Sequence, residues 1–270
     1  MMLGLDNFYI ADSVEFMKNK VADNFFDLTV TSPPYDDLRN YNGFKFDYKT
    51  MLNELYRVTK IGGVVVWVVG DKIHKGSESG TSFKQALYAM EIGFNLHDTM
   101  IYEKHNPMPN AGTRYQQSFE YMFIFSKGKP KTTNIALRER LNKANDKRTY
   151  RKKSFSRDQD GEFTKSDYHI KDYVPKGNVW KYLVGLYHTS SDKVAFKHPA
   201  IFPEELAQDH ILSWSNENDI VFDPMCGSGT VAKMAYLNNR RYICVDMSVE
   251  YISNICVPRL EHIKQQINLF

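Results

Sequence analysis

The chain alternates between short apolar runs and longer segments in which apolar residues recur at helical spacing. The run 64–69 is apolar without alternation, as in a parallel strand that is covered on both faces. Further strands are predicted at 7–10, 25–30, 95–103, 119–126, 220–223 and 241–246. Helices are predicted at 13–20, 48–60, 83–92, 197–214, from 230 onward and at 251–268. The order strand, helix, strand, helix favours an α/β fold with a doubly wound sheet.

Capping residues and glycines set two of the expected helix boundaries. Asp12 or Ser13 is a suitable N-cap for the helix that runs to about Lys20. Gly62 and Gly63 follow the helix at 48–60, and we expect them to end it.

Composition indicates an intracellular protein with a substantial core. The 270 residues are 42% hydrophobic and 14% aromatic, which suits one large domain or a domain with an insertion. No apolar run approaches the roughly 18 residues of a membrane span, and residues 1–9 lack a signal-peptide pattern. Cys226, Cys244 and Cys256 have neither metal-ligand nor redox spacing. We therefore expect a reduced, cytoplasmic protein.

Positive charge is concentrated in one segment. Residues 127–176 hold fifteen Lys or Arg against seven Asp or Glu, a net charge of +8, whereas the whole chain carries +3 and the remainder is therefore at −5. A basic segment on a mildly acidic body favours a polyanionic partner. The segment lacks apolar periodicity, so we expect an inserted module or a loop that orders on binding. A solvated, partly disordered insertion is the alternative.

The first motif that carries chemistry is Thr31-Ser32-Pro33-Pro34-Tyr35, which follows the run 25–30. Two prolines cannot continue a sheet interior, so a stiff loop begins at the carboxyl end of the strand. Open α/β sheets bind ligands at that end. A hydroxyl and a carbonyl there can bind an NH2 group, and the tyrosine ring can stack on a flat base; a plain turn is the alternative. The polar segment 36–43 is expected to be a mobile loop beside this motif.

A second motif, Phe222-Asp-Pro-Met-Cys-Gly-Ser-Gly-Thr230, is a glycine turn between a strand and a helix. Glycine lets the backbone approach a ligand closely, and the start of a helix offers free N–H groups. The next strand ends at Asp246, whose carboxylate can accept hydrogen bonds from both hydroxyls of a ribose.

Three kinds of site are compatible with a glycine turn. A P-loop is nearly excluded, because Lys-Ser or Lys-Thr does not follow Gly229. A dinucleotide site stays open, because Gly227, Gly229 and Ala232 match its spacing. An S-adenosylmethionine site is the third, since Asp223 can face a positively charged amino group that a nicotinamide dinucleotide lacks.

Together the motifs resemble those of the DNA amino-methyltransferases, which alkylate the exocyclic amine of cytosine (N4) or adenine (N6). The resemblance spans nearly the whole chain apart from the basic segment and rests on Thr31–Tyr35, Phe222–Thr230, Cys244–Asp246 and His198–Pro203. The Pro-Pro-Tyr motif precedes the glycine turn, which is the order of the family's β group, of the restriction-modification type.

The resemblance implies a fold and a division into domains. We expect a doubly wound, mostly parallel, seven-stranded sheet of the Rossmann-like methyltransferase type, circularly permuted. Residues 1–126 and 177–270 would form the catalytic and S-adenosylmethionine-binding domain, and residues 127–176 the target-recognition insertion.

The resemblance also implies which residues bind the cofactor. Asp223 and the glycine turn would hold its methionine end, Asp246 its ribose and Met247 its adenine. The full set is Asp12, Thr31, Lys197, Pro199, Phe202, Asp223, Pro224, Cys226, Gly227, Gly229, Thr230, Asp246 and Met247. Capping alone also explains Asp12. Met225-Cys226 and Asp246-Met247 depart from the usual residues in chemically similar ways, and Cys226 is expected to pack rather than act as a nucleophile.

Catalysis is implied for Ser32, Pro33, Pro34 and Tyr35, with no metal ion. The base would leave the duplex, and Tyr35 would stack on it. DNA contacts are implied for Arg39, Arg138, Arg140, Arg148, Arg151, Lys152 and Lys153. Serine before Pro-Pro-Tyr favours cytosine N4, with adenine N6 as the alternative.

Other functions are left open. An NAD-dependent oxidoreductase, a non-catalytic DNA-binding protein and a methylase of protein or RNA each fit part of the pattern. The recognition sequence, a homodimer and a cognate restriction endonuclease are not determined by the sequence.

Overall fold

The structure, a computed structural model, describes residues 3–34, 46–107, 114–134, 137–139, 153–157, 160–167 and 173–267. Contacts divide the chain into two units, Met1–Asn134 with Asn178–Phe270, and Ile135–Gly177. The first unit includes residues 127–134, in which the backbone N–H of Lys127 donates to the Gly63 carbonyl at 3.1 Å and that of Asn134 to the Ser213 carbonyl at 2.8 Å.

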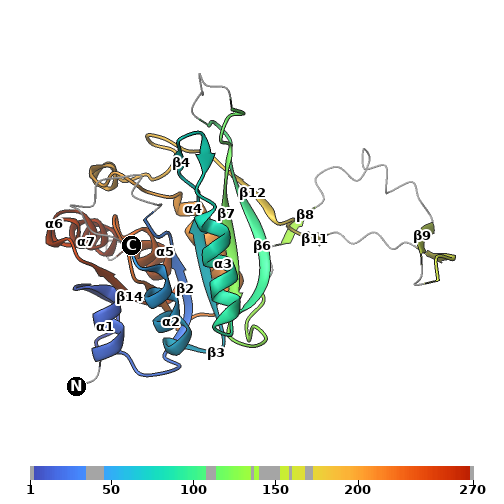
Figure 1. Ribbon diagram of the computed structural model, residues 1–270. Helices are drawn as coiled ribbons and strands as arrows, with labels where there is room; N and C mark the ends of the chain where they lie inside the picture. Colours follow the sequence, from blue (N-terminus) through green and yellow to red (C-terminus); the bar gives the residue numbers. More distant parts are fainter. Residues whose placement is uncertain are drawn as a thin grey trace. The chain divides into compact units, whose positions relative to one another are not determined.

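The first unit is built on a mixed sheet that has eight strands among the described residues (Figure 1). Across the sheet, these strands are β1 (Asn7–Ile10), β14 (Arg241–Asp246), β13 (Ile220–Asp223), β2 (Phe26–Thr31), β3 (Thr59–Val69), β7 (Phe119–Ser126), β6 (Asn95–Lys104) and β12 (Val179–Tyr182). Neighbours pair in parallel except at β7, which is antiparallel to β3 and β6. The predicted doubly wound, mostly parallel sheet is confirmed, with β12 as an additional strand.

Helices cover both faces of this sheet (Figure 1). One face carries α1 (Ser13–Lys20), α2 (Tyr48–Val58) and α3 (Thr81–Glu91), and the other carries α4 (Glu204–Trp214), α5 (Thr230–Leu237) and α7 (Val257–Ile267). Strand β3 shows why its run lacks alternation. Val64, Val66 and Val68 lie in the core under α4 and α5, and Val65, Trp67 and Val69 lie in the core under α2 and α3. Burial of each such side chain contributes about 1.5–3 kcal/mol.

Of the two helix boundaries predicted from capping residues and glycines, one is confirmed and the other is wrong. Asp12 caps α1, since its Oδ1 accepts from the backbone N–H of Glu15 at 2.9 Å. The glycines at 62 and 63 were expected to end α2, but they lie inside β3, which begins at Thr59 directly after the helix. A side chain at Gly63 would clash, because its Cβ would lie 2.8 Å from the Thr59 methyl group.

Two later helices also differ from the prediction. The segment before α4 is a separate 3-10 turn, η2 (Lys193–Lys197), and α4 begins at Glu204 after Pro203 as its N-cap. The C-terminal helix is divided into α6 (Val249–Tyr251), a π-helical turn η3 (Ile252–Cys256) and α7. No helix among the described residues has the length and apolar character to cross a membrane.

The smaller elements are antiparallel pairs. In the first unit, β4 (Ile73–His74) pairs with β5 (Ser77–Glu78). In the second unit, β8 (Leu137–Glu139) pairs with β11 (Tyr173–Pro175), and β9 (Lys153–Arg157) with β10 (Phe163–Asp167).

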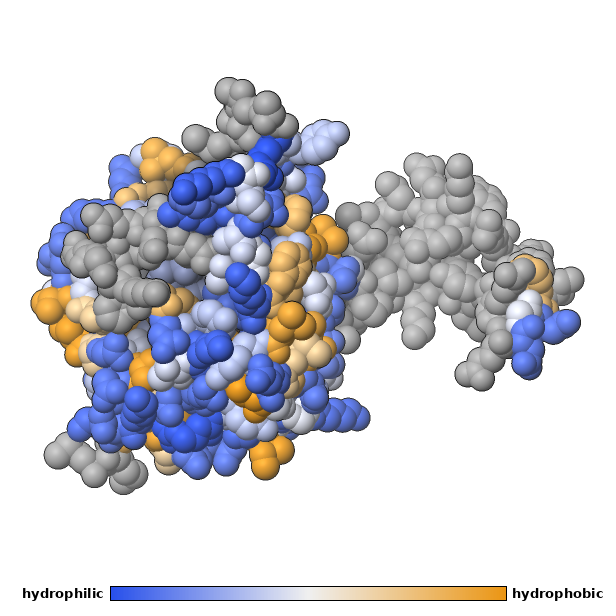
Figure 2. All heavy atoms as spheres, in the orientation of Figure 1, coloured by the Kyte–Doolittle hydropathy of each residue, from blue (hydrophilic) through white to orange (hydrophobic). Residues whose placement is uncertain are grey.

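The visible face of the first unit is largely hydrophilic over α1 and α2 (Figure 2). Apolar side chains gather near α3, whose Phe83, Leu87 and Met90 are exposed.

Candidate active site

The two sequence motifs meet at the centre of the sheet. Strand β13 continues through α5 to β14 on one side, and β2 continues through α2 to β3 on the other. The crevice between the carboxyl ends of β13 and β2 is therefore the topological switch point, where open α/β sheets bind ligands. Thr31 ends β2 and Asp223 ends β13, so the Pro-Pro loop and the glycine turn start side by side.

A buried hydrogen bond joins the motifs. The Thr31 hydroxyl donates to Oδ1 of Asp223 at 2.8 Å, and the backbone N–H of Met225 donates to the same oxygen at 3.1 Å. Burial raises the pKa of Asp223 to about 7, the hydrogen bonds oppose this rise, and the nearby charge of Asp246 adds to it. A cation at this carboxylate would favour its ionised form.

The loop after Thr31 leaves the carboxyl end of β2. Pro33 is buried, whereas Ser32 and Pro34 are half-buried. Tyr35, Arg39 and the expected mobile loop at 36–43 lie outside the described residues.

The glycine turn is fixed by Asp246. Its Oδ2 accepts from the backbone N–H of Gly227 and its Oδ1 from that of Ser248, each at 2.9 Å. A carboxylate oxygen has two lone pairs, so both oxygens retain capacity for ribose hydroxyls. Gly229 is the N-cap of α5 with φ +74° and provides no side-chain cap, which leaves the first N–H groups of the helix available to an anion such as the cofactor carboxylate.

Apolar groups flank the Asp246 carboxylate. Ile10 pairs in register with Asp246, and Ile10 and Met247 are each about half exposed. Asp12 follows two residues after Ile10, but one of its oxygens already caps α1. The exposed side chains of Ile10 and Met247 beside the Asp246 carboxylate suit an adenosine. The Asp223 carboxylate and the N-terminus of α5 suit the ammonium and carboxylate groups of an amino acid. The donor set therefore fits S-adenosylmethionine.

The segment 197–202 packs behind the turn. The His198 ring is buried and meets the Tyr251 ring edge-on at 4.5 Å. A Cβ on Gly227, whose φ is +48°, would lie 2.8 Å from the His198 ring, so this approach requires glycine. Lys197 and Pro199 are exposed, and Phe202 packs against the core.

Pro224 and Cys226 hold the turn in shape through backbone hydrogen bonds, and neither provides a reactive side chain. The Pro224 carbonyl accepts from the Ser13 hydroxyl, and the backbone N–H of Cys226 donates to the Val245 carbonyl at 3.0 Å. Burial raises the pKa of the Cys226 thiol well above its ordinary value, which keeps the thiol protonated.

Sequence reasoning missed several residues that build this site. Ser13 was considered only as a cap, and Ser248 and Tyr251 carried no motif. Arg259 donates to the Ser228 carbonyl at 2.8 Å and to the Thr230 hydroxyl at 3.1 Å. No local pattern marks such partners, because the fold brings them together from distant segments.

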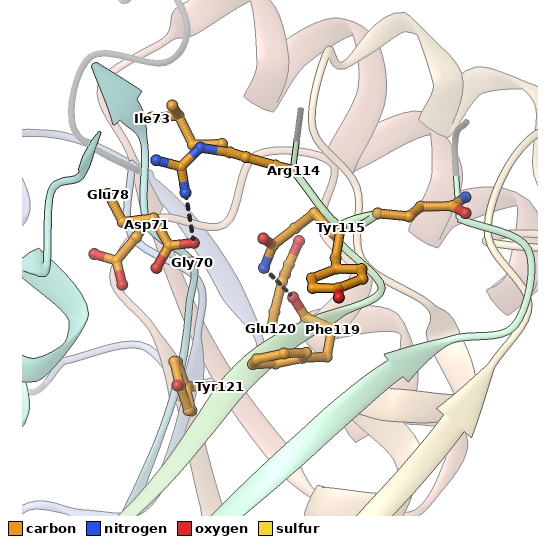
Figure 3. Close-up of a pocket in the computed structure, with 11 residues that line it drawn as sticks. Gly70, Asp71, Ile73, Glu78, Arg114, Tyr115, Phe119, Glu120 and Tyr121 are labelled. Atoms are coloured by element: carbon orange, nitrogen blue, oxygen red, sulfur yellow. Dashed lines mark hydrogen bonds and ion pairs between the residues drawn. The ribbon is translucent and has the colours of Figure 1, made fainter. Parts of the chain in front are cut away.

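A cavity of about 430 Å³ opens one strand away from the Pro-Pro loop (Figure 3). Thr31 pairs in register with Trp67, so Gly70 follows β3 at the same level at which Pro34 follows β2. The cavity is lined by Gly70, Asp71, Ile73, Glu78, Arg114, Tyr115, Gln116, Gln117, Phe119, Glu120 and Tyr121. Its walls combine aromatic rings with polar side chains.

Most predicted DNA-binding residues lie outside the part of the chain that the structure describes. Arg138 lies in β8 and Lys153 in β9 of the second unit, and their side chains lie outside the described parts. Arg140, Arg148, Arg151 and Lys152 lie outside the described residues altogether.

Comparison with known proteins identifies relatives in sequence. The family model of N6/N4 DNA methylases matches residues 26–256. The orphan methyltransferase M.BamHII of Bacillus amyloliquefaciens is 59% identical over 239 residues, which cover 87% of this chain and 89% of that protein.

Solved structures show the same fold. The PvuII DNA methyltransferase, described as cytosine-N4-specific, aligns with a TM-score of 0.67 at 19% identity over 97% of this chain and 92% of that chain. The complex of M1.HpyAVI with SAM aligns with a TM-score of 0.60 at 21% identity over 94% and 98%. The chain belongs to the N6/N4 DNA methylase family, whose members are S-adenosylmethionine-dependent DNA amino-methyltransferases, and this confirms the enzyme class and the cofactor predicted from its sequence.

Proposed function

We propose that this enzyme methylates N4 of cytosine at a specific DNA sequence. The observation that carries the proposal is the half-buried Ser32, held beside the Thr31–Asp223 hydrogen bond at the switch point. A serine offers a weaker acceptor to an amine than the aspartate or asparagine expected in enzymes that act on adenine. Methylation of adenine N6 is the alternative.

The proposed catalytic residues activate the amine by geometry. Its lone pair is delocalised into the ring, so the free amine is a poor nucleophile. The Ser32 hydroxyl and the Pro33 carbonyl would each accept a hydrogen bond from the amine, which would draw the nitrogen toward tetrahedral geometry. When bound, S-adenosylmethionine supplies the sulfonium methyl group as the electrophile. Fixed orientation of reacting groups can lower a barrier by about 7–11 kcal/mol at best.

The cofactor would be held along the crevice. We assign its ammonium to Asp223, its carboxylate to the start of α5 and its ribose to Asp246, with Met247 against the adenine. The rest of the proposed set is Asp12, Thr31, Lys197, Pro199, Phe202, Pro224, Cys226, Gly227, Gly229 and Thr230.

The target base would leave the duplex and enter the cavity beside Gly70. Tyr115, Phe119 and Tyr121 line it, and base–aromatic stacking is worth about 1–3 kcal/mol per base. Tyr35 is proposed to stack on the base, and Pro34 is proposed as a further catalytic residue of the same motif.

Residues 127–176 are proposed as the target-recognition insertion. Their net charge of +8 suits phosphate contacts, for which we assign Arg138, Arg140, Arg148, Arg151, Lys152 and Lys153, together with Arg39. Because the relative at 59% identity is an orphan methyltransferase, we propose that this enzyme works without a cognate endonuclease. Its substrate agrees with the cytoplasmic location expected from the sequence.

Transfer of labelled methyl groups tests the proposal. The enzyme is incubated with methyl-labelled S-adenosylmethionine and duplex DNA, and the product nucleosides are resolved by chromatography. Label in N4-methylcytosine is expected, and its loss with the variant Ser32→Ala assigns it to this site. Label in N6-methyladenine would replace the proposed base, and label only in protein or RNA would refute the function.

A further inference from the structure

A fully buried arginine lies directly behind the glycine turn. Arg259, on α7, is 3% exposed and uses all five of its N–H donors. Nη1 donates to the Ser228 carbonyl at 2.8 Å and to the Thr230 hydroxyl at 3.1 Å, both in the turn. Nε and Nη2 point to another segment, where they meet Asp192 at 2.6 Å, Ser190 at 3.1 Å and Glu204.

Those other partners form the base of the loop that carries His198. The backbone N–H of Glu204 donates to the Thr189 carbonyl at 3.0 Å, and the Ser190 hydroxyl donates to the Glu204 carboxylate at 2.5 Å. These contacts close the segment 189–204 at its ends. Its tip brings the His198 ring against Gly227, so the loop and the turn meet at two places, one through His198 and one through Arg259.

A second buried cation, Lys233, binds the same carboxylates as Arg259 but makes its hydrogen bonds to the loop. Lys233 donates to Asp192 at 2.8 Å, to Glu204 at 2.9 Å and to Ser191 at 3.2 Å, which occupies its three donors with groups of the loop. Burial alone would raise the pKa of Asp192, but hydrogen bonds from Lys233 and Arg259 hold it below its ordinary value. Lys233 and Arg259 therefore share the neutralisation of both carboxylates, and Arg259 additionally binds Ser228 and Thr230.

A positive charge that served only to neutralise Asp192 and Glu204 would be unfavourable at the position of Arg259. Ser228 and Thr230 flank the N-terminus of α5, where the helix dipole favours negative rather than positive groups. The planar guanidinium is suited to this place because it can donate in several fixed directions at once, which an ammonium group cannot do.

We propose that Arg259 is a positioning residue of the cofactor site, which locks the glycine turn to the loop 189–204 and so sets the shape of the cleft that receives the methionine end of S-adenosylmethionine. The inference rests on the assignment of the glycine turn to the cofactor. Arg259 itself would not touch the cofactor, since its side chain is buried and directed to the turn and the loop.

Two variants separate positioning from charge balance. Arg259→Lys keeps the charge but loses the fork of donors, whereas Lys233→Met removes a charge from the same carboxylates and leaves the contacts with the turn in place. Dissociation constants for S-adenosylhomocysteine are measured by calorimetry, with melting temperatures and steady-state kinetics alongside. We expect Arg259→Lys to weaken binding about tenfold or more and to raise KM for S-adenosylmethionine, with kcat within about threefold of wild type.

Lys233→Met is expected to lower the melting temperature while the dissociation constant stays within about threefold. Equal weakening of binding by both variants, or unchanged binding with Arg259→Lys, would overturn the inference. Ser190→Ala provides a milder test if the charged variants fail to fold, because it removes one anchor of Arg259 and alters no charge. Binding weakened about fivefold supports the proposal, and unchanged binding contradicts it.

The same assay distinguishes this inference from the assignment on which it rests. If wild-type protein did not bind S-adenosylhomocysteine, or if Asp223→Asn left binding unchanged, the cofactor site itself would be misassigned. If wild type binds and Asp223→Asn weakens binding while Arg259→Lys does not, only the role of Arg259 is refuted.

Discussion

The Thr31 hydroxyl donates a 2.8 Å hydrogen bond to the Asp223 carboxylate, although 192 positions separate the two residues in the chain. Both side chains are buried at the carboxyl ends of neighbouring strands. Thr31 precedes the proposed catalytic serine, and Asp223 begins the glycine turn. One hydrogen bond therefore connects the loop that is proposed to receive the base with the turn that is proposed to hold the cofactor.

Loss of the Thr31 hydroxyl should weaken cofactor binding. In Thr31→Val, Asp223 loses a donor and its pKa rises further, so less of the carboxylate is ionised near pH 7. Hydrogen bonds to charged groups are worth about 1.5–3 kcal/mol, so we expect the dissociation constant for S-adenosylmethionine to rise about tenfold or more. Calorimetric titration measures it. Thr31→Ser retains the hydroxyl and should bind within about threefold of wild type; equal weakening in both variants would point to packing instead.

Cofactor affinity should depend on pH through Asp223. Its pKa in the folded protein is about 7 against an ordinary value of 3.8, so below pH 7 an ammonium group that binds there must displace a proton. Affinity should therefore increase by up to about tenfold per pH unit up to pH 7 and level off above it. Titrations between pH 5.5 and pH 8.5 test this, and Asp223→Asn should bind weakly with a flat profile. A flat profile for wild type would exclude the carboxylate as the ammonium partner.

The stability of the cofactor-free protein should change in the opposite direction. Because the folded pKa of Asp223 is raised, folding takes up a proton between pH 4 and pH 7. The contribution of Asp223 to the free energy of unfolding is therefore greatest below pH 4, is lost as the pH rises through 7, and is constant above. Denaturant unfolding of wild type and Asp223→Asn isolates this component. The difference between the two proteins should vary across that pH range and stay constant above it.

Much of the sheet was predictable because each central strand is covered on both faces. The run 64–69 had to be buried on two sides, and the structure divides its residues between two cores. Strand β12 was missed because it is a short edge strand in which only alternate residues are buried, next to polar Asn178. The glycines at 62 and 63 were misinterpreted because a helix end and a closely packed strand start both favour glycine.

The candidate site could be located from the sequence only where a local motif marks it. The Pro-Pro loop and the glycine turn are contiguous, so their residue types and spacing can be recognised. Arg259 is different, since its partners come from positions 190, 192, 204, 228 and 230. The hydrogen bond from the Ser13 hydroxyl to the Pro224 carbonyl spans 211 positions, and no local sequence pattern near either residue predicts it. Tertiary pairing of polar groups has no periodic signature in sequence.

A side chain at Gly227 should damage the site more than the backbone strain alone explains. In Gly227→Ala, the Cβ would lie 2.8 Å from the His198 ring, in addition to the cost of about 1–2 kcal/mol for a positive φ. We expect a lower melting temperature and a large loss of affinity for S-adenosylhomocysteine. Gly128→Ala is the matched control, because Gly128 has φ +75° and its Cβ would make only an ordinary contact at 4.0 Å. The control should lose stability and keep its affinity.

Removal of the Ser32 hydroxyl should slow methyl transfer without affecting the cofactor. Ser32→Ala removes one of two proposed acceptors for the target amine, and loss of one oriented hydrogen bond in a transition state costs about 10²–10³ in kcat. Single-turnover transfer to duplex DNA measures the step, and S-adenosylhomocysteine binding serves as the control. A variant with unchanged turnover would remove Ser32 from the mechanism, whereas loss of both properties would indicate a distorted crevice.

Substitution of basic residues in the insertion should alter DNA binding alone. Each phosphate contact contributes about 0.9 to the slope of log affinity against log salt concentration, so replacement of three contacting residues should reduce the slope by about 2.7. We choose Arg151, Lys152 and Lys153, replaced together by alanine, and measure affinity for duplex DNA by anisotropy at several salt concentrations. Affinity for S-adenosylhomocysteine should not change, because the residues proposed to bind the cofactor belong to the other unit.

The control for this variant must carry the same change in net charge. Lys18, Lys20 and Lys84 are exposed on helices of the first unit, and replacing all three by alanine also removes three positive charges. If the insertion holds the phosphates, this control should retain the wild-type salt slope, since charges that do not contact DNA release no condensed counterions. Equal slopes for the two triple variants would instead mean that DNA responds to the overall charge of the protein, and the insertion would lose its assignment as the DNA-binding segment.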